Sequence, residues 1–242
     1  GKTVIQWKDS NKKRKPVKTE LKIDKNSWIF QSQYETDEEE VAVEELQQQI
    51  TMLLTKERDV PPSFIATLGA YRALYKFPWA QGLCKREWSG DIKEVIDQQI
   101  SEPLDEQSLR SQIPQLTPIH NAVSQSVREQ YEENPYPRWI KTGLVDEGRA
   151  IGAALQRAPL YFDLGDYISP ESPQILVAGC GTGQHALVTA TRFSNARVLA
   201  VDLSLSSLSY AMRKTNEAGF SNIEYAQADI TELGDLGRRF DL

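Results

Sequence analysis

A glycine-rich segment near residue 180 has the residue types and spacing that could do chemistry. Gly179-Cys180-Gly181-Thr182-Gly183 follows a short apolar run at residues 175–178 and precedes a helical pattern that starts near His185. Glycines in such a turn let the backbone bend sharply and let a ligand approach main-chain N–H groups. The start of the next helix adds a dipole that favours a carboxylate or a phosphate. The segment therefore predicts a ligand-binding loop, although glycine also makes ordinary tight turns.

Two acidic residues strengthen this prediction because each follows a later apolar run. Asp202 comes directly after residues 198–201, and Asp229 comes shortly after residues 223–226. A carboxylate in the place of Asp202 can accept hydrogen bonds from both hydroxyls of an adenosine ribose. A carboxylate in the place of Asp229 can accept one from the exocyclic amine of an adenine. Local roles are the alternative, since Asp202 could cap a helix near Ser204 and Asp229 could cap a turn at Thr231.

The elements that must position these residues alternate between strands and helices. Short buried runs at 175–178, 198–201 and 223–226 are separated by helical stretches, which is typical of a parallel sheet built from βαβ units. Residues 240–242 begin a fourth run just as the sequence ends. We therefore expect an α/β fold with only the first half of its sheet, and a sequence that is a fragment, because half an open sheet would leave an unpaired edge.

Three stretches of this region resemble class I S-adenosylmethionine-dependent methyltransferases. They read Ile-Leu-Val-Ala-Gly-Cys-Gly-Thr-Gly at 175–183, Ala-Val-Asp-Leu-Ser at 200–204 and Gln-Ala-Asp-Ile at 227–230. The resemblance implies a Rossmann-like methyltransferase sheet and S-adenosyl-L-methionine as cofactor.

The same resemblance implies a role for each matching residue. It places Gly179, Cys180, Gly181, Thr182 and Gly183 under the methionine moiety. It places Asp202 on the ribose, Leu203 over the adenine as an apolar cover, and Asp229 with the Ala228 backbone on the adenine. One position departs from the family, because Val177 stands where members usually carry an acid. The catalytic residues stay unassigned, since a general base in this family generally follows the fourth strand.

A second stretch, residues 128–139, resembles the segment upstream of the methyltransferase domain in bacterial proteins that often carry tetratricopeptide repeats. Its Asn134-Pro135-Tyr136-Pro137 precedes the first strand, so it is not the Asn-Pro-Pro-Tyr signature that follows the fourth strand of amide and adenine N-methyltransferases. One interpretation is a rigid helix stop. The other is a lid of Tyr131, Tyr136 and Trp139 that closes on the cofactor or acceptor, where aromatic rings would suit a sulfonium cation.

The residues before the sheet read as mainly helical and divide the chain into segments 1–60, 61–143 and 144–242. The first segment has a basic cluster at 11–15, an aromatic patch of Trp28, Ile29, Phe30 and Tyr34, and a helix opened by the acids at 37–40. Its expected apolar face includes Val41 and Ile50. The second segment has helical stripes around 65–74 and 92–100. A third stripe, Ile119, Val123, Val127 and Tyr131, should face the core from a helix that begins at Thr117-Pro118.

Composition narrows the possible partners. The formal net charge is −6, with 34 acidic and 28 basic side chains, so nothing predicts a nucleic-acid partner. The two cysteines, Cys84 and Cys180, and the two histidines, His120 and His185, lack metal-ligand spacing, so no metal site is expected. The absence of a long apolar run predicts no membrane span. We expect a cytoplasmic protein whose methyl acceptor is a protein or a small molecule.

Two other functions fit parts of the pattern. Residues 181–186 satisfy G-x-G-x-x-A, and Asp202 suits an NAD ribose, as in a nucleotide-dependent oxidoreductase. That frame leaves Asp229 without a role. A non-catalytic scaffold with a degenerate Rossmann half is the other alternative, and it is favoured by the missing acid at Val177.

Overall fold

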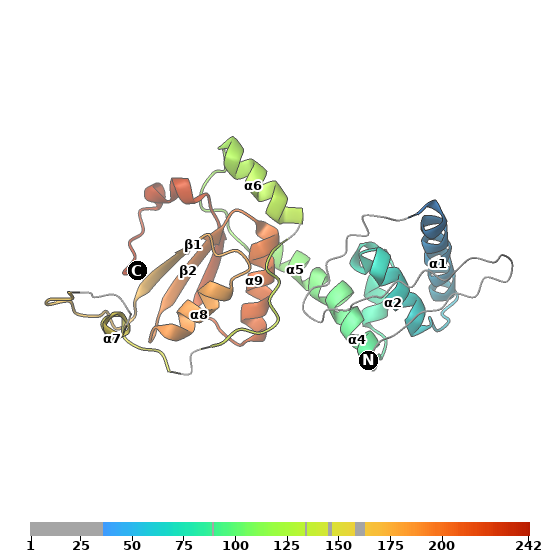
Figure 1. Ribbon diagram of the computed structural model, residues 1–242, viewed down its shortest axis with the longest axis horizontal. Helices are drawn as coiled ribbons and strands as arrows, with labels where there is room; N and C mark the ends of the chain where they lie inside the picture. Colours follow the sequence, from blue (N-terminus) through green and yellow to red (C-terminus); the bar gives the residue numbers. More distant parts are fainter. Residues whose placement is uncertain (1–35, 89, 134, 145–146, 158–162) are drawn as a thin grey trace.

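A computed structural model of the chain describes residues 36–88, 90–133, 135–144, 147–157 and 163–242 (Figure 1). A helical part and a sheet-containing part lie side by side, with helix α5 (Glu102–Arg110) between them. The basic cluster at 11–15 and the aromatic patch at 28–34 lie outside the described residues. In the described part of the chain, no helix is both long and apolar enough to span a membrane.

The sheet has three parallel strands in the order β1-β2-β3, namely β1 (Gln174–Ala178), β2 (Arg197–Asp202) and β3 (Ile223–Gln227). Each strand is linked to the next by a helix, α8 (Gln184–Arg192) and then α9 (Leu205–Glu217). In register, Ala178 lies beside Val201 and Asp202 beside Gln227, so the carboxyl ends of all three strands meet at one edge. This confirms the expected α/β fold with a parallel, Rossmann-like sheet.

The two faces of the sheet have separate cores. Helices α8 and α9 cover one face, where Ala186 and Leu208 pack against Val177, Val198 and Ala200. On the other face, four buried residues pack against side chains from outside the sheet: Leu199, Val201, Ala226 and Ala228. Because side chains are buried on both faces of the sheet, the strands read as continuous apolar runs in the sequence.

Residues beyond β3 return to the other side of β1. The backbone N–H of Leu176 donates to the carbonyl of Leu242 at 2.9 Å, and that of Asp241 donates to Gln174 at 2.7 Å. Residues 240–242, which the sequence predicts to begin a fourth strand, therefore run beside β1. β2 therefore lies on one side of β1 and the last residues lie on the other. Sheets of this α/β type bind ligands at such a switch in strand order.

The helical part is built around one core. It contains α1 (Asp37–Thr55), α2 (Pro62–Tyr71), α3 (Ala80–Cys84) and α4 (Asp91–Ile96), the last of which continues through a π-helical turn at Asp97–Ser101 into α5. Its fully buried residues come from both sides of residue 60: Ile50, Ile65, Leu68, Leu74, Leu83 and Ile100. The core therefore runs across the segment boundary expected there.

Helix α1 begins where its acidic residues predict. The Thr36 hydroxyl accepts from the Glu39 N–H and the Glu39 carboxylate accepts from the Thr36 N–H, which is a capping box. The expected apolar face is confirmed at Ile50, which is fully buried, but not at Val41, which is 56% exposed, and Val43 is buried instead.

Helix α6 (Ala122–Glu133) corrects two sequence-based expectations. It begins after Asn121, whose side chain accepts from the Val123 N–H at 2.8 Å, and not at Thr117. Its predicted core stripe is exposed beyond Ile119, with Val123 at 70%, Val127 at 38% and Tyr131 at 41%. The reason is that α6 lies over the polar carboxyl edge of the sheet, so its buried residue is Ser124. A short helix, α7 (Ile151–Gln156), precedes β1.

The segment between α5 and α6 pairs with the free edge of β3. The Gln227 N–H donates to the Pro114 carbonyl and the Leu116 N–H donates to the Gln227 carbonyl, both at 2.8 Å. Residues 114–116, which we call the edge segment, thus satisfy backbone groups that an edge strand would expose. Thr117 directly follows this segment, and its hydroxyl contacts the residues just beyond β3.

Candidate functional site

The glycine loop follows β1 with a left-handed backbone at each of its three glycines. The φ angles of Gly179, Gly181 and Gly183 are 71°, 53° and 81°. A Cβ added at Gly183 would lie 2.5 Å from the Ala211 Cβ, so this glycine is required for contact with α9. A Cβ at Gly179 or Gly181 would meet nothing within 4 Å. Those two glycines therefore leave open space above the loop, as a bound ligand would need.

Asp202 links the end of β2 to this loop. Its Oδ2 accepts from the Gly181 N–H at 2.8 Å, and its Oδ1 accepts from the Ser204 N–H at 3.0 Å. Ser204 itself caps α9 by accepting from the Ser207 N–H. The capping role considered for Asp202 therefore belongs to Ser204, and Asp202 instead joins the loop to the start of α9. Each carboxylate oxygen can accept a second bond, so capacity remains for ribose hydroxyls.

Asp229 has one carboxylate oxygen that Thr231 engages and one that lacks a well-aligned hydrogen bond among the described residues. Its Oδ1 accepts from the Thr231 N–H at 3.0 Å and from the Thr231 hydroxyl at 2.7 Å, so the expected turn is present. Its Oδ2 is buried and has no hydrogen-bond partner. The Ser124 hydroxyl is the main cause of a lowered pKa for this carboxyl, followed by Thr231, although Ser124 makes no well-aligned bond to Oδ2. A buried acceptor that lacks a well-aligned donor fits an amine on a ligand.

Backbone contacts hold the two acids next to each other. The Ala228 N–H donates to the Asp202 carbonyl at 3.0 Å, and the Gln227 side chain donates to the Leu203 carbonyl at 2.7 Å. Leu203 is half-buried and Ala228 is fully buried. The structure therefore brings together the loop and all four predicted residues that follow β2 and β3.

Three further residues that the sequence analysis discussed lie at or near the loop. Cys180 is buried, and burial together with the Asp202 charge raises the pKa of its thiol, so it stays protonated. Val177 is buried in the core and supplies no polar group. His185 is exposed at the start of α8.

Of the three residues of the predicted lid, Trp139 bonds to the loop, whereas Tyr131 and Tyr136 have exposed side chains. The Trp139 indole N–H donates to the Thr182 carbonyl at 2.8 Å, and the Thr182 hydroxyl donates to the Pro137 carbonyl at 2.6 Å. The Tyr131 side chain is 41% exposed and that of Tyr136 is 71% exposed. We call residues 131–133 and 135–139 the flap; Asn134 lies outside the described residues.

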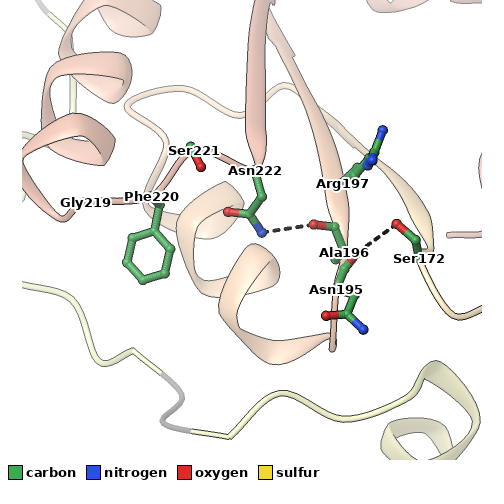
Figure 2. Close-up of a pocket in the computed structure, with 8 residues that line it drawn as sticks. All are labelled: Ser172, Asn195, Ala196, Arg197, Gly219, Phe220, Ser221 and Asn222. Carbon is green, nitrogen blue, oxygen red and sulfur yellow. Dashed lines mark hydrogen bonds between the residues drawn. The ribbon is translucent and has the colours of Figure 1, made fainter.

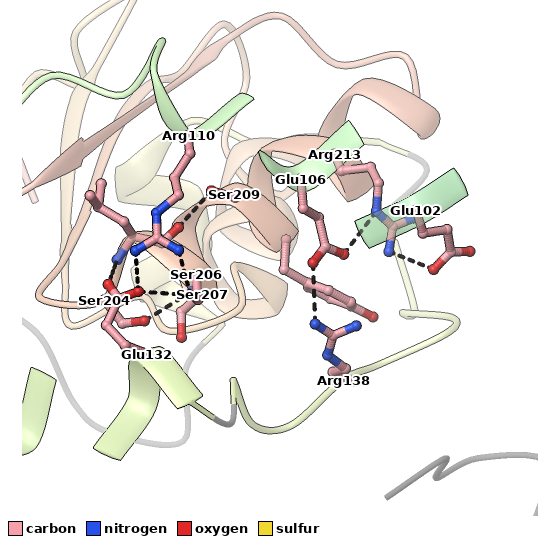
Figure 3. A network of polar contacts seen from close by, with 12 residues as sticks. Glu102, Glu106, Arg110, Glu132, Arg138, Ser204, Ser206, Ser207, Ser209 and Arg213 are labelled. Carbon is pink, nitrogen blue, oxygen red and sulfur yellow. Dashed lines mark hydrogen bonds and ion pairs between the residues drawn. The ribbon is translucent and has the colours of Figure 1, made fainter. Parts of the chain in front are cut away.

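Glu132 ties the flap to the start of α9. Its carboxylate accepts from the Leu205 N–H at 2.5 Å, from the Ser206 hydroxyl at 2.7 Å and from Arg110 at 2.5 Å (Figure 3). The Ser204 hydroxyl also donates to the Tyr131 carbonyl at 3.1 Å. Sequence reasoning missed Glu132, and also Thr117, whose hydroxyl accepts from the Asp229 N–H at 2.7 Å. Both act across long sequence separations that local patterns do not encode.

A buried charge cluster lies behind the flap (Figure 3). Arg213 of α9, 5% exposed, pairs with Glu106 at 3.1 Å and with Glu102 at 2.8 Å, both from α5. Burial opposes the charge on Arg213, but the two carboxylates raise its pKa. Burial also raises the pKa of Tyr210 to about 12, so its hydroxyl remains a donor to the Trp139 carbonyl.

The hollow in Figure 2 is not part of this site. It is lined by residues at or just before the starts of β2 and β3, among them Asn195, Arg197 and Asn222. These residues lie at the amino ends of the strands, away from the carboxyl edge that carries the loop.

Comparison with known proteins agrees with this geometry. Residues 175–242 match a family described as a methyltransferase domain. A malonyl-[acyl-carrier protein] O-methyltransferase from Acetivibrio thermocellus is 36% identical over 80 residues, which is 33% of this chain and 27% of that protein. A tRNA (guanine-N(7)-)-methyltransferase from Rubrobacter xylanophilus is 37% identical over 68 residues, or 28% of this chain and 30% of that protein. The chain thus spans less than a third of the length of these curated relatives.

Two solved structures show more distant likeness. PKMT2 from Rickettsia typhi, in complex with AdoHcy, is 28% identical, with a TM-score of 0.27, over 29% of this chain and 14% of that one. Geranyl diphosphate C-methyltransferase from Streptomyces coelicolor is 14% identical, with a TM-score of 0.32, over 47% of this chain and 51% of that one. The family match at residues 175–242 includes the glycine loop, Asp202 and Asp229, and it supports S-adenosylmethionine as the cofactor.

Proposed function

We propose that this protein is an S-adenosylmethionine-dependent methyltransferase whose acceptor is a protein or a small molecule. The observation that carries the proposal is the buried, unpartnered Oδ2 of Asp229 at the same sheet edge as the open loop. A donor amine on a ligand would satisfy that oxygen, and Asp202 beside it has capacity for hydroxyl donors.

The residues that would hold the cofactor are those of the sheet edge. Gly179 to Gly183 would lie under the methionine moiety, Asp202 would hold the ribose, and Asp229 with Leu203 and Ala228 would hold the adenine. The cofactor supplies an electrophilic methyl group on a sulfonium. Since methyl transfer by in-line displacement depends mainly on positioning, the work of these residues is to bind and orient.

The flap is the proposed lid. Trp139 and Pro137 already contact Thr182 of the loop, and Tyr131 and Tyr136 present exposed rings on the same flap. Aromatic faces near a sulfonium would stabilise its positive charge and keep water from it.

The two curated relatives are named for different acceptors, an acyl-carrier-protein conjugate and a tRNA guanine. Their similarity covers only 80 and 68 residues of this chain, so it leaves the acceptor open. Neither relative is an oxidoreductase, which argues against the NAD alternative.

Calorimetric titration of the full chain with S-adenosylhomocysteine, with NADH as control ligand, tests the proposal. We expect binding of S-adenosylhomocysteine only, weakened about tenfold or more in Asp202→Asn, because a charge-assisted hydrogen bond contributes roughly 1.5–3 kcal/mol. Asp235→Asn, an exposed aspartate outside the site, should bind like wild type. A folded protein that binds neither ligand would support the scaffold alternative, and one that binds only NADH would support the oxidoreductase.

A further inference from the structure

We propose that helix α5 fastens both ends of the flap over the glycine loop and Asp202, and so controls how long the cofactor stays bound. This inference rests on the function proposed above. It assigns a positioning role to Arg110 and Arg138, two residues that do not touch the loop themselves.

The first fastening is the ion pair between Arg110 of α5 and Glu132 of the flap, whose nearest atoms are 2.5 Å apart. The same carboxylate accepts from the Leu205 N–H and the Ser206 hydroxyl at the first turn of α9. That turn directly follows Asp202 and Leu203 in the chain. Arg110 thus stabilises the contact that joins the flap to the ribose side of the site.

The second fastening is the ion pair between Arg138 of the flap and Glu106 of α5, at 3.2 Å. Glu106 is 8% exposed and its other oxygen accepts from Arg213, so it is a rigid anchor. The Arg138 guanidinium also lies 5.1 Å from the centre of the Tyr210 ring. Arg138 is followed by Trp139, which bonds to the loop at Thr182.

Both fastenings come from one face of one helix. Glu106 and Arg110 are four residues apart in α5, a spacing that places them one above the other. Figure 3 shows the two ion pairs on neighbouring stretches of α5, with the serines of the α9 start beside one and Arg213 beside the other. By this proposal, a ligand held between the loop and the flap is released when the flap separates from this face.

The test uses two arginine variants that leave the buried anchor intact. Arg110 and Arg138 are 43% and 44% exposed, so Arg110→Gln and Arg138→Gln remove charge without opening the core. Lys141→Gln is the matched control, because it removes one positive charge from an exposed position just beyond the flap.

Stopped-flow dissociation of S-adenosylhomocysteine and hydrogen exchange of the ligand-free protein are the two readouts. We expect dissociation about threefold faster in each single variant, because one half-exposed ion pair contributes a factor of about that size. Loss of both pairs should make dissociation about tenfold faster in the double variant. Amide exchange in the flap should rise in the double variant, and Lys141→Gln should match wild type in both measurements.

Unchanged dissociation in the double variant would overturn this inference and leave the proposed function standing. Faster dissociation with unchanged flap exchange would also overturn it, because the effect would then arise elsewhere. If wild-type protein binds no S-adenosylhomocysteine, the proposed function and this inference fail together.

Discussion

At the scale of single residues, the three loop glycines serve two purposes that the sequence alone does not separate. Gly183 is required by packing, because α9 leaves no room for a Cβ, whereas Gly179 and Gly181 face open space. The acids after β2 and β3 show a similar overlap. Asp202 accepts from the backbone of the loop and of Ser204, whereas Asp229 performs the capping role considered for it and keeps one buried oxygen without a well-aligned partner. Structural and ligand-binding roles therefore coexist at these positions.

Substitution of Gly183 by alanine should destabilise the fold. We expect the free energy of unfolding to fall by about 3 kcal/mol, from overpacking against Ala211 and from the left-handed backbone. Gly219→Ala is the control, because its φ is also positive, at 78°, but a Cβ there would meet nothing within 4 Å; it should cost about 1 kcal/mol. Urea denaturation measures both, and equal losses would contradict the packing argument.

Asp229 should make stability depend on acid pH. Its pKa is lowered from an ordinary 3.8, so its ionised form stabilises the fold above about pH 4, and this contribution disappears as the pH falls through the lower folded value. The difference in unfolding free energy between wild type and Asp229→Asn should therefore shrink below pH 4. Denaturant titrations from pH 7 to pH 2.5 would show it. A constant difference across that range would be inconsistent with the ionised carboxylate being the stabilising form.

At the scale of elements, the sequence predicted the strands and the helices between them because their apolar runs are buried on both faces. It failed for α6. Its apolar residues at every fourth position indicated a core-facing stripe, but the side that faces the protein is the one with Ser124. The apolar side of a helix usually faces the protein, but a helix placed over the polar edge of a sheet turns its polar side inward. A single sequence does not show what lies beneath a helix. Glu132 was missed for the same reason.

The edge segment should depend on the Thr117 hydroxyl. Thr117→Val keeps the shape of the side chain but leaves the buried N–H of Asp229 without an acceptor. We expect a loss of about 1–3 kcal/mol in the free energy of unfolding. Thr55→Val, on the exposed side of α1, should change it by less than about 0.5 kcal/mol. Equal effects of the two substitutions would exclude a special role for Thr117.

At the scale of the whole molecule, the helical part and the sheet are joined by charge as well as by apolar packing. Helix α5 packs along α9, and Arg213 is held between Glu102 and Glu106 at that interface. The sequence predicted neither partner of this cluster, because acids and arginines on helices normally read as solvated surface. Their pairing depends on how two helices more than 90 residues apart meet.

Removal of Arg213 should weaken this junction strongly. Arg213→Ala leaves the buried Glu106 with only the half-exposed Arg138 as a partner, and we expect a loss of about 3–5 kcal/mol, with the helical part and the sheet unfolding in separate transitions. Arg238→Ala breaks an exposed pair with Glu224 and should cost less than about 1 kcal/mol. Calorimetry resolves the transitions, and a single unshifted transition in Arg213→Ala would show that apolar packing alone holds the junction.

The bond between Asp229 and Thr117 joins residues 112 positions apart. Contacts of such long sequence separation form late in folding, because the loop between them must first be ordered. The adenine side of the proposed site should then appear only after the edge segment and β3 have reached their places. During refolding, ligand binding would therefore mark the completion of the native fold rather than an early stage of it.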